Sequence, residues 1–243
     1  MFLSCSDPPV VRNDPAPARV ADGMRIDIWS DVVCPWCYLG ANRLDTALDI
    51  VGRDGVDIRW HAFQLDPSAR AEPRDLRTTL EAKYGAGSFD SMTGRLVALG
   101  EAEGLEYRFD HALAINTADA HRLLSWAGDS AGDSADAGPG AQERLVRRFF
   151  VGYFTDGEDL SRHESLLDAV EQVGLDRDSA AAVLAGTEYA DQVVADQQGA
   201  HERGITGVPA FVIDDQWLIP GAQDVDRLVA LLERVRGDGS VAR

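Results

Sequence analysis

The chain has 243 residues, of which 45% are hydrophobic and 26% charged, with 41 acidic side chains against 23 basic ones. A chain of this length and apolar content can bury a core in one large domain or two small ones. Its net charge of −18 argues against binding to nucleic acid or to anionic membrane surfaces. No apolar run reaches the roughly 18 residues that a transmembrane helix needs. We therefore expect a globular protein that binds neither nucleic acid nor a membrane.

Residues 1–23 are rich in proline and show no regular apolar pattern, which favours a disordered N-terminal tail. The segment lacks the positive charge and the apolar stretch of about 7 to 15 residues that mark a secretory signal, so we expect a cytoplasmic location. Ordered structure is expected from Met24, which is also a second candidate for the start of translation. Cys5 lies alone in the tail, and its surroundings suggest no role.

A strand, a helix and a second strand follow. The alternating segment 25–31 predicts the end of a strand, and segment 56–63, which has turn residues on both sides, predicts another. Between Cys37 and Val51 apolar residues recur every three or four positions, which indicates an amphipathic helix that stops at Gly52. Such a β-α-β unit carries parallel strands joined by a right-handed crossover.

Residues 73–204 show helical patterns and no segment that is typical of a strand, so we expect a large all-helical insertion. Within it, Ser161 and Glu164 have the spacing of a capping box at the start of a helix. Residues 128–141 are rich in glycine, serine, aspartate and alanine, which predicts a flexible loop between two helices.

Strand patterns return near the end of the chain. Two short apolar runs, 210–213 and 217–219, flank Asp214 and Asp215, which suits a hairpin. A last amphipathic helix begins near Val225.

These elements predict an α/β protein with the order β-α-β, helical insertion, β-β-α. Segments 24–72 and 205–243 would form one domain, and residues 73–204 would form the inserted one.

A Cys-Pro-Trp-Cys motif occupies positions 34–37, between the first strand and the first helix. A helix N-terminus stabilises a thiolate, which would make Cys34 a nucleophile, and Cys37 lies one turn further along, where it can resolve a mixed disulfide. Pro35 suits the first turn of a helix because it costs no hydrogen bond there. Trp36 would add a broad surface for substrate beside the sulfur.

Other interpretations of the cysteine pair stay open. A Cys-x-x-Cys motif is half of a zinc site, but the chain has only three cysteines, and its five histidines show no matching spacing, so we expect no metal. Two unreactive buried cysteines would also fit, because a free cysteine is often a small core residue.

A Gly-Val-Pro segment precedes the late hairpin. Proline cannot donate to a sheet ladder, so Pro209 at the entrance of a central strand needs an explanation. A cis Val208–Pro209 bond would supply one, because it would turn Val208 so that its backbone groups can pair with an extended substrate. An ordinary trans loop proline is the alternative.

Together these motifs resemble the thioredoxin fold in its DsbA-like form, in which a helical domain interrupts the fold. The segments SDVVCPWCYLG, HAFQLDP, INTADAHRLLSWA and GITGVPAFVID resemble the FrnE branch of that family. The resemblance implies a thiol–disulfide oxidoreductase with Cys34 as attacking thiol, Cys37 as resolving thiol and Pro209 as a cis-proline. It also implies protein or small-molecule disulfides as substrates, no cofactor besides the cysteine pair, and a glutathione- or thioredoxin-type electron partner. Direction of electron flow, reduction potential and oligomeric state do not follow from it.

Two other functions stay open. Glutathione-dependent isomerases and transferases share the fold, although they are expected to carry serine in place of Cys34. A non-catalytic module that binds a peptide through Val208 and Pro209 is the second alternative. Three polar residues, Gln64, Asn116 and His121, are candidates to approach the sulfurs across the groove between the domains.

Overall fold

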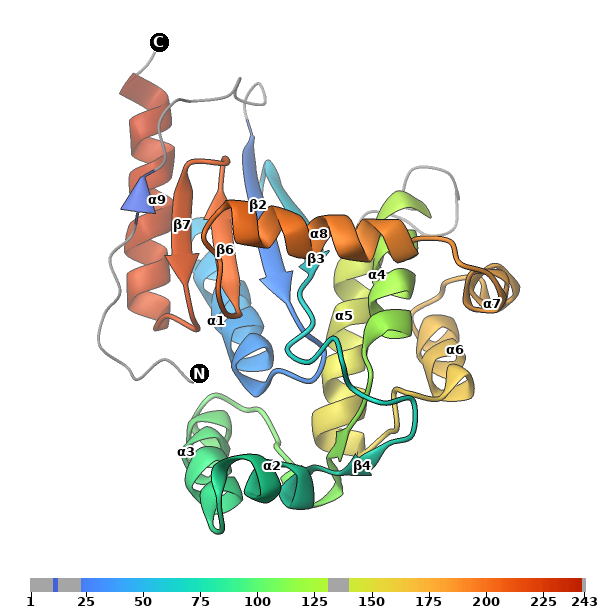
Figure 1. Ribbon diagram of the computed structural model, residues 1–243. Coiled ribbons are helices and arrows are strands. Elements are labelled where there is room, and N and C mark those ends of the chain that lie inside the picture. Colours follow the sequence, from blue (N-terminus) through green and yellow to red (C-terminus); the bar gives the residue numbers. More distant parts are fainter. Residues whose placement is uncertain (1–10, 13–22, 131–139, 242–243) are drawn as a thin grey trace.

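The computed structural model describes residues 11–12, 23–130 and 140–241, and a five-stranded sheet lies at its centre (Figure 1). The strands follow the order β1-β7-β6-β2-β3, in which β2 and β3 are parallel and all other neighbours antiparallel. Their bounds are β1 (Val11–Arg12), β2 (Met24–Ser30), β3 (Val56–Ala62), β6 (Ala210–Ile213) and β7 (Trp217–Pro220). The parallel pair and the late hairpin confirm the predicted thioredoxin-type α/β order.

The two faces of the sheet carry separate cores because side chains alternate along a strand. Ile26 and Ile28 are fully buried in the larger core, which they share with helices α1 (Pro35–Val51) and α9 (Val225–Val241). Trp29 belongs to a smaller core with Ala200 of α8 (Ala190–Glu202). Figure 1 shows α8 crossing in front of the strands and α1 behind them.

Helix α1 begins and ends as its sequence predicts. Cys34 is the N-cap residue and Pro35 the first helical residue, where its missing N–H group costs nothing. The helix ends at Gly52, whose φ of 92° is easily reached only by glycine. The Cys-Pro-Trp-Cys motif therefore lies at the first turn of a long, well-terminated helix.

The segment between β3 and β6, called the insertion below, is mainly helical. It contains α2 (Leu76–Tyr84), α3 (Ser88–Ala102), η1 (Phe109–His111), α4 (Ala118–Ser130), α5 (Ala141–Val151), η2 (Gly152–Asp156), α6 (His163–Gln172), α7 (Arg177–Ala185) and α8. Figure 1 shows α2 and α3 below the sheet, α4 and α5 beside β3, and α6 and α7 further from the sheet on the same side. No helix in the described part of the chain is long and apolar enough to cross a membrane.

Several details differ from the expectations. Two short strands, β4 (Arg74–Asp75) and β5 (Leu113–Ala114), pair inside the insertion, which is therefore not entirely helical. Ser161 caps no helix, because its hydroxyl donates to Asp159 Oδ1 and α6 begins two residues later.

Two predicted flexible segments are described only in part. In the N-terminal tail, which was predicted to be disordered, Val11 and Arg12 add an edge strand to β7. The rest of the tail, including Cys5, lies outside the described residues, as does 131–139 of the predicted loop 128–141; α4 extends through 128–130.

Helix α8 is attached to the sheet by three ionisable side chains, called the charged cluster below: Asp27, His61 and Asp196. His61 of β3 lies between two carboxylates, with Nε2 2.9 Å from Asp27 Oδ1 and Nδ1 3.1 Å from Asp196 Oδ1. Burial lowers the pKa of His61, but hydrogen bonds and charge from both carboxylates outweigh it and raise the pKa to about 9. Asp196 also accepts the Ala62 N–H at 2.9 Å, so α8 is hydrogen-bonded to the backbone of β3 as well.

Candidate active site

Cys34 lies where β2 gives way to α1, with its side chain turned toward the loop before β6. Its N–H donates to Asp31 O, and its carbonyl accepts the Cys37 N–H, both at 3.0 Å, so the backbone around it is fixed. The thiol is 3% exposed and lies 3.6 Å from Val208 O, to which it donates a hydrogen bond. Two segments 174 residues apart therefore meet at this sulfur.

The Val208–Pro209 peptide bond is cis, as the sequence pattern predicts. Pro209 lies directly against α1 at Gly40, where an added Cβ would stand 3.0 Å from Pro209 Cγ and 3.3 Å from Phe211 Cζ. Glycine at position 40 thus allows the helix backbone to approach the proline closely. This contact sets the distance between the cysteine-bearing helix and the Val208 loop.

Cys37 lies one helical turn after Cys34 and is more deeply buried, at 1% exposure. Burial, together with a hydrogen bond to Cys34 and the charge of Cys34, raises the pKa of the Cys37 thiol well above its usual value. Interactions with the Ser30 side chain and the Asp31 backbone oppose that shift. Neither of these two cysteines forms a disulfide in the described part of the chain. Their surroundings differ, because Cys34 contacts a loop carbonyl and Cys37 faces the protein interior.

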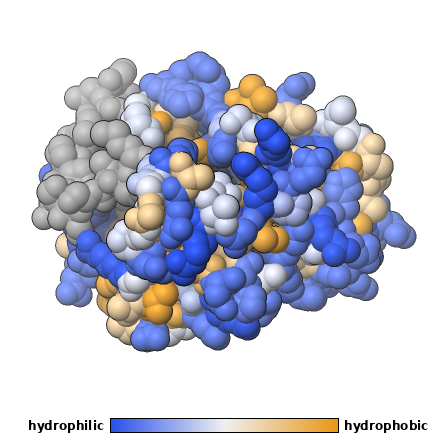
Figure 2. All heavy atoms as spheres, turned by 60° about the horizontal axis from the view of Figure 1, so that its bottom comes forward, coloured by the Kyte–Doolittle hydropathy of each residue, from blue (hydrophilic) through white to orange (hydrophobic). Residues whose placement is uncertain are grey.

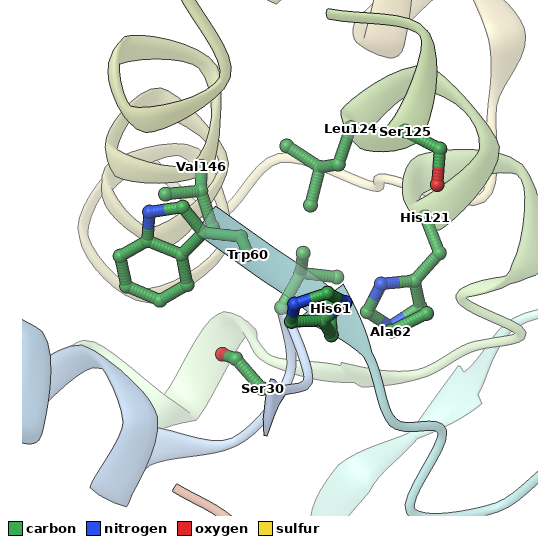
Figure 3. A pocket seen from close by; sticks show the side chains of 9 residues that line it. Ser30, Trp60, His61, Ala62, His121, Leu124, Ser125 and Val146 are labelled. Atoms are coloured by element: carbon green, nitrogen blue, oxygen red, sulfur yellow. The ribbon is translucent and has the colours of Figure 1, made fainter. Parts of the chain in front are cut away.

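A small cavity lies behind this interior side, between β3 and the helices α4 and α5 (Figure 3). It has room for roughly one water molecule. Its lining comprises Ser30, Val32, Trp60, His61, Ala62, His121, Leu124, Ser125 and Val146. The buried Ser30 hydroxyl has no hydrogen-bond partner of ordinary geometry within the described residues.

Of the three polar residues that the sequence suggested near the sulfurs, His121 comes nearest to the motif. Its Nε2 lies 3.2 Å from Asp31 Oδ1, three residues before Cys34, and both side chains are almost completely buried. Asn116 instead caps α4 by accepting the Ala118 N–H at 2.9 Å. Gln64 lies 3.5 Å from Thr117 Oγ1 and bonds α8 through its backbone N–H. None of these three side chains forms a hydrogen bond with a cysteine within the described residues.

The structure adds one contact that sequence patterns did not reveal. Tyr107, from the turn after α3, donates its hydroxyl to Pro35 O at 2.7 Å and so binds the insertion to the first turn of α1. Tyr107 also packs edge-to-face on Tyr38 of that helix, with ring centres 5.6 Å apart. Burial, followed by the negative charge of Cys34, raises the pKa of the Tyr107 hydroxyl, which therefore stays protonated and keeps donating.

Trp36 is half-buried in the first turn of α1, with the Arg95 guanidinium of α3 over its ring. No group of three or more histidine, cysteine or acidic side chains in the described ranges is arranged to hold a metal ion.

A cysteine pair at the start of α1, facing a cis-proline loop in a thioredoxin fold that helices interrupt, defines a thioredoxin-fold protein of the DsbA type. The family model of the DSBA-like thioredoxin domain matches residues 25–233, and the chain belongs to this family.

Known relatives agree with that membership. The crystal structure of a probable DsbA oxidoreductase from Streptomyces coelicolor is similar, with 37% sequence identity and a TM-score of 0.79 over 88% of this chain and 90% of that one. The uncharacterized protein YwbO of Bacillus subtilis is 28% identical over 84% of this chain and 92% of its own length. The cytosolic disulfide reductase DsbM from Pseudomonas aeruginosa shares the fold, with a TM-score of 0.62 over 87% of this chain and 98% of that one at 17% identity. The family and the Streptomyces coelicolor relative support a thiol–disulfide redox function in general terms.

Proposed function

We propose that this protein exchanges disulfides with its substrates through Cys34 and Cys37. The observation that carries the proposal is the position of Cys34, at the N-cap of α1 with its sulfur 3.6 Å from Val208 O. Helix N-termini favour thiolates, and a substrate bound along the Val208 loop would bring its own sulfur to this position. Trp36 and Pro35 would border the bound substrate.

In the reducing direction the Cys34 thiolate attacks one sulfur of a substrate disulfide. A Cys34–substrate disulfide forms, the substrate S–S bond breaks, and the first substrate thiolate leaves. Cys37 then loses its proton to water and attacks the Cys34 sulfur, which forms the Cys34–Cys37 disulfide and releases the second substrate thiolate. The substrate gains two electrons and the cysteine pair loses them, and the oxidising direction is the exact reverse. Because the pKa of Cys37 is raised, the thiolate of Cys34 is the one that reacts first.

We propose peptide or small-molecule disulfides as substrates and a glutathione-type thiol as electron partner, in the cytosol. The cytosolic disulfide reductase DsbM shares the fold at 16% identity, and its structure has been determined with GSH, which supports the proposal of a glutathione-type partner. Placement in the FrnE-like branch stays a prediction from the sequence motifs.

The test compares the wild type with three single-cysteine changes in insulin reduction and in oxidation of a reduced, unfolded protein. We expect Cys34→Ala to abolish turnover in both assays, and Cys5→Ala, the matched control, to keep it. Cys37→Ala should accumulate a mixed disulfide on Cys34 that mass spectrometry detects. Equal turnover in the wild type and in Cys34→Ala would refute the proposal, and peptide binding without any turnover would favour the binding module instead.

A further inference from the structure

A cation lies beside the cysteine motif. The guanidinium carbon of Arg95 lies 5.9 Å from the centre of the Trp36 ring, and Trp36 is two residues after Cys34 in the first turn of α1. Arg95 is exposed on α3, so its N–H groups are accessible from solvent. An aromatic ring attracts a guanidinium that lies over it, and the N–H groups of that guanidinium can still bind a second group from solvent.

Arg95 differs from two arginines near α1 and α3. Arg77 forms an ion pair with Asp90 at 2.9 Å, and Arg43 forms one with Glu103 at 2.6 Å. No carboxylate forms an ion pair with Arg95 within the described parts of the chain. The N–H edge of the Arg95 guanidinium, which suits a carboxylate, therefore forms no ion pair among the described residues.

The surroundings make this charge unusual. The chain as a whole carries a net charge of −18, which on average repels anionic substrates. Figure 2, which brings the α2–α3 end of the molecule forward, shows a largely hydrophilic face with scattered apolar side chains. On such a surface, charge contributes more to the selection of a small substrate than a broad apolar contact would.

We propose that Arg95 is a specificity-determining residue that binds a carboxylate adjacent to the disulfide attacked by Cys34. The preferred substrates would be small or peptidic disulfides that carry a carboxylate close to the reacting sulfur. Trp36 would hold the guanidinium in place and contact the apolar part of the same substrate. This inference rests on the proposed function, because it assumes that substrate disulfides reach Cys34 past Trp36.

The experiment measures the first step alone. In a Cys5→Ala/Cys37→Ala background only Cys34 reacts: its thiolate attacks a disulfide probe, a mixed disulfide forms, and an aromatic thiolate leaves. The leaving group is followed by its absorbance, as the thiolate for the nitrobenzoate probe and as the protonated thione for the pyridine probe. Two aromatic probes are compared, dithiobis-nitrobenzoate, which carries a carboxylate on each ring, and dithiodipyridine, which carries none. The rate constant for dithiobis-nitrobenzoate is divided by the rate constant for dithiodipyridine. This ratio cancels any change in the reactivity of Cys34 itself.

We expect Arg95→Gln to lower this ratio about threefold at low ionic strength, the size expected for one exposed ion pair. Arg95→Glu should lower it further, and about 0.5 M salt should remove most of the difference. Arg59→Gln is the matched control, because Arg59 is 57% exposed on β3, pairs only locally with Asp57, and its loss changes the net charge equally. An unchanged ratio in Arg95→Gln, or an equal fall in Arg59→Gln, would overturn the inference. Neither result bears on disulfide exchange through Cys34, which the Cys34→Ala assay tests. Failure of carboxylate binding by Arg95 can therefore be distinguished from failure of the proposed function.

Discussion

Two of the junctions between the insertion and the thioredoxin-type part of the fold use different chemistry. At the active-site junction, Tyr107 donates a hydrogen bond to Pro35 O, and His121 pairs with Asp31 just before Cys34. At the charged cluster, on the opposite face of the sheet from α1, His61 lies between Asp27 and Asp196 and binds α8. The first junction touches the cysteine motif directly and the second does not. Changes at the charged cluster should therefore alter stability alone, whereas changes at the active-site junction should also alter the reactivity of Cys34.

The largest effect is expected from Asp196→Ala. This change leaves the Ala62 N–H without its acceptor and His61 with a single carboxylate, and breaking a buried ionic pair costs about 4 kcal/mol. Urea unfolding should show that loss, while the folded fraction keeps its wild-type kcat/KM toward a disulfide. Asp191→Ala, which removes an exposed acid from the first turn of the same helix, should cost less than about 1 kcal/mol. A fall in kcat/KM for Asp196→Ala would mean that the two junctions are coupled.

The charged cluster also predicts a pH dependence. The pKa of His61 is raised from 6.5 to about 9 in the folded protein. Its contribution to stability is therefore fully present below about pH 6.5 and is lost as pH rises through 9, a change of about 3 kcal/mol. We expect the free energy of unfolding of the wild type to fall over this range, and His61→Gln to lack that part of the fall. His163→Gln, at a half-exposed histidine paired with Asp119, should behave like the wild type. If His61→Gln shows the wild-type slope, the cluster does not hold a charged histidine.

Packing at the active-site junction can be tested through α3. A Cβ added at Gly100 would stand 2.5 Å from the Tyr107 ring and 2.9 Å from Leu105 O, so Gly100→Ala must displace Tyr107 from its place against Pro35. We expect a loss of about 2 kcal/mol and slower mixed-disulfide formation at Cys34. Gly94→Ala, in the same helix with open space around it, should instead be neutral or gain up to about 1 kcal/mol. Equal stability of the two variants would show that the Tyr107 ring is not packed closely against Gly100.

Local sequence patterns predict the cysteine motif well, but they predict the contacts of neither junction. Cys34, Cys37 and Pro209 lie in short segments whose local patterns carry their own meaning, namely a strand end, a helix start and a proline before a strand. Tyr107, by contrast, binds a group 72 residues away, and no pattern in the sequence signals it. His121 was a candidate for the groove, but no periodicity indicates its partner Asp31, 90 residues away.

Short elements fail for a related reason. The two-residue strands β4 and β5 are too short to show alternation, so no apolar pattern marks them. The Ser161 capping pattern fails because Asp159, two residues earlier, accepts the hydroxyl hydrogen bond that a cap would have used. Local signals therefore predict an element or a motif only where no nearby side chain competes for the same group.

The smallest effect, and the one that separates the two junctions most cleanly, is expected from Tyr107→Phe. This change removes only the hydroxyl that donates to Pro35 O, which should cost about 1 kcal/mol of stability. Because Pro35 belongs to the first turn of α1, that turn becomes less constrained, and the rate of mixed-disulfide formation at Cys34 should fall about threefold. Tyr153→Phe is the matched control, since the Tyr153 hydroxyl donates to Leu113 O within the insertion. It should cost a similar free energy and leave the rate unchanged. A rate that falls equally in both variants would show that Cys34 responds to the overall stability of the insertion, and the distinction between the two junctions would then be wrong.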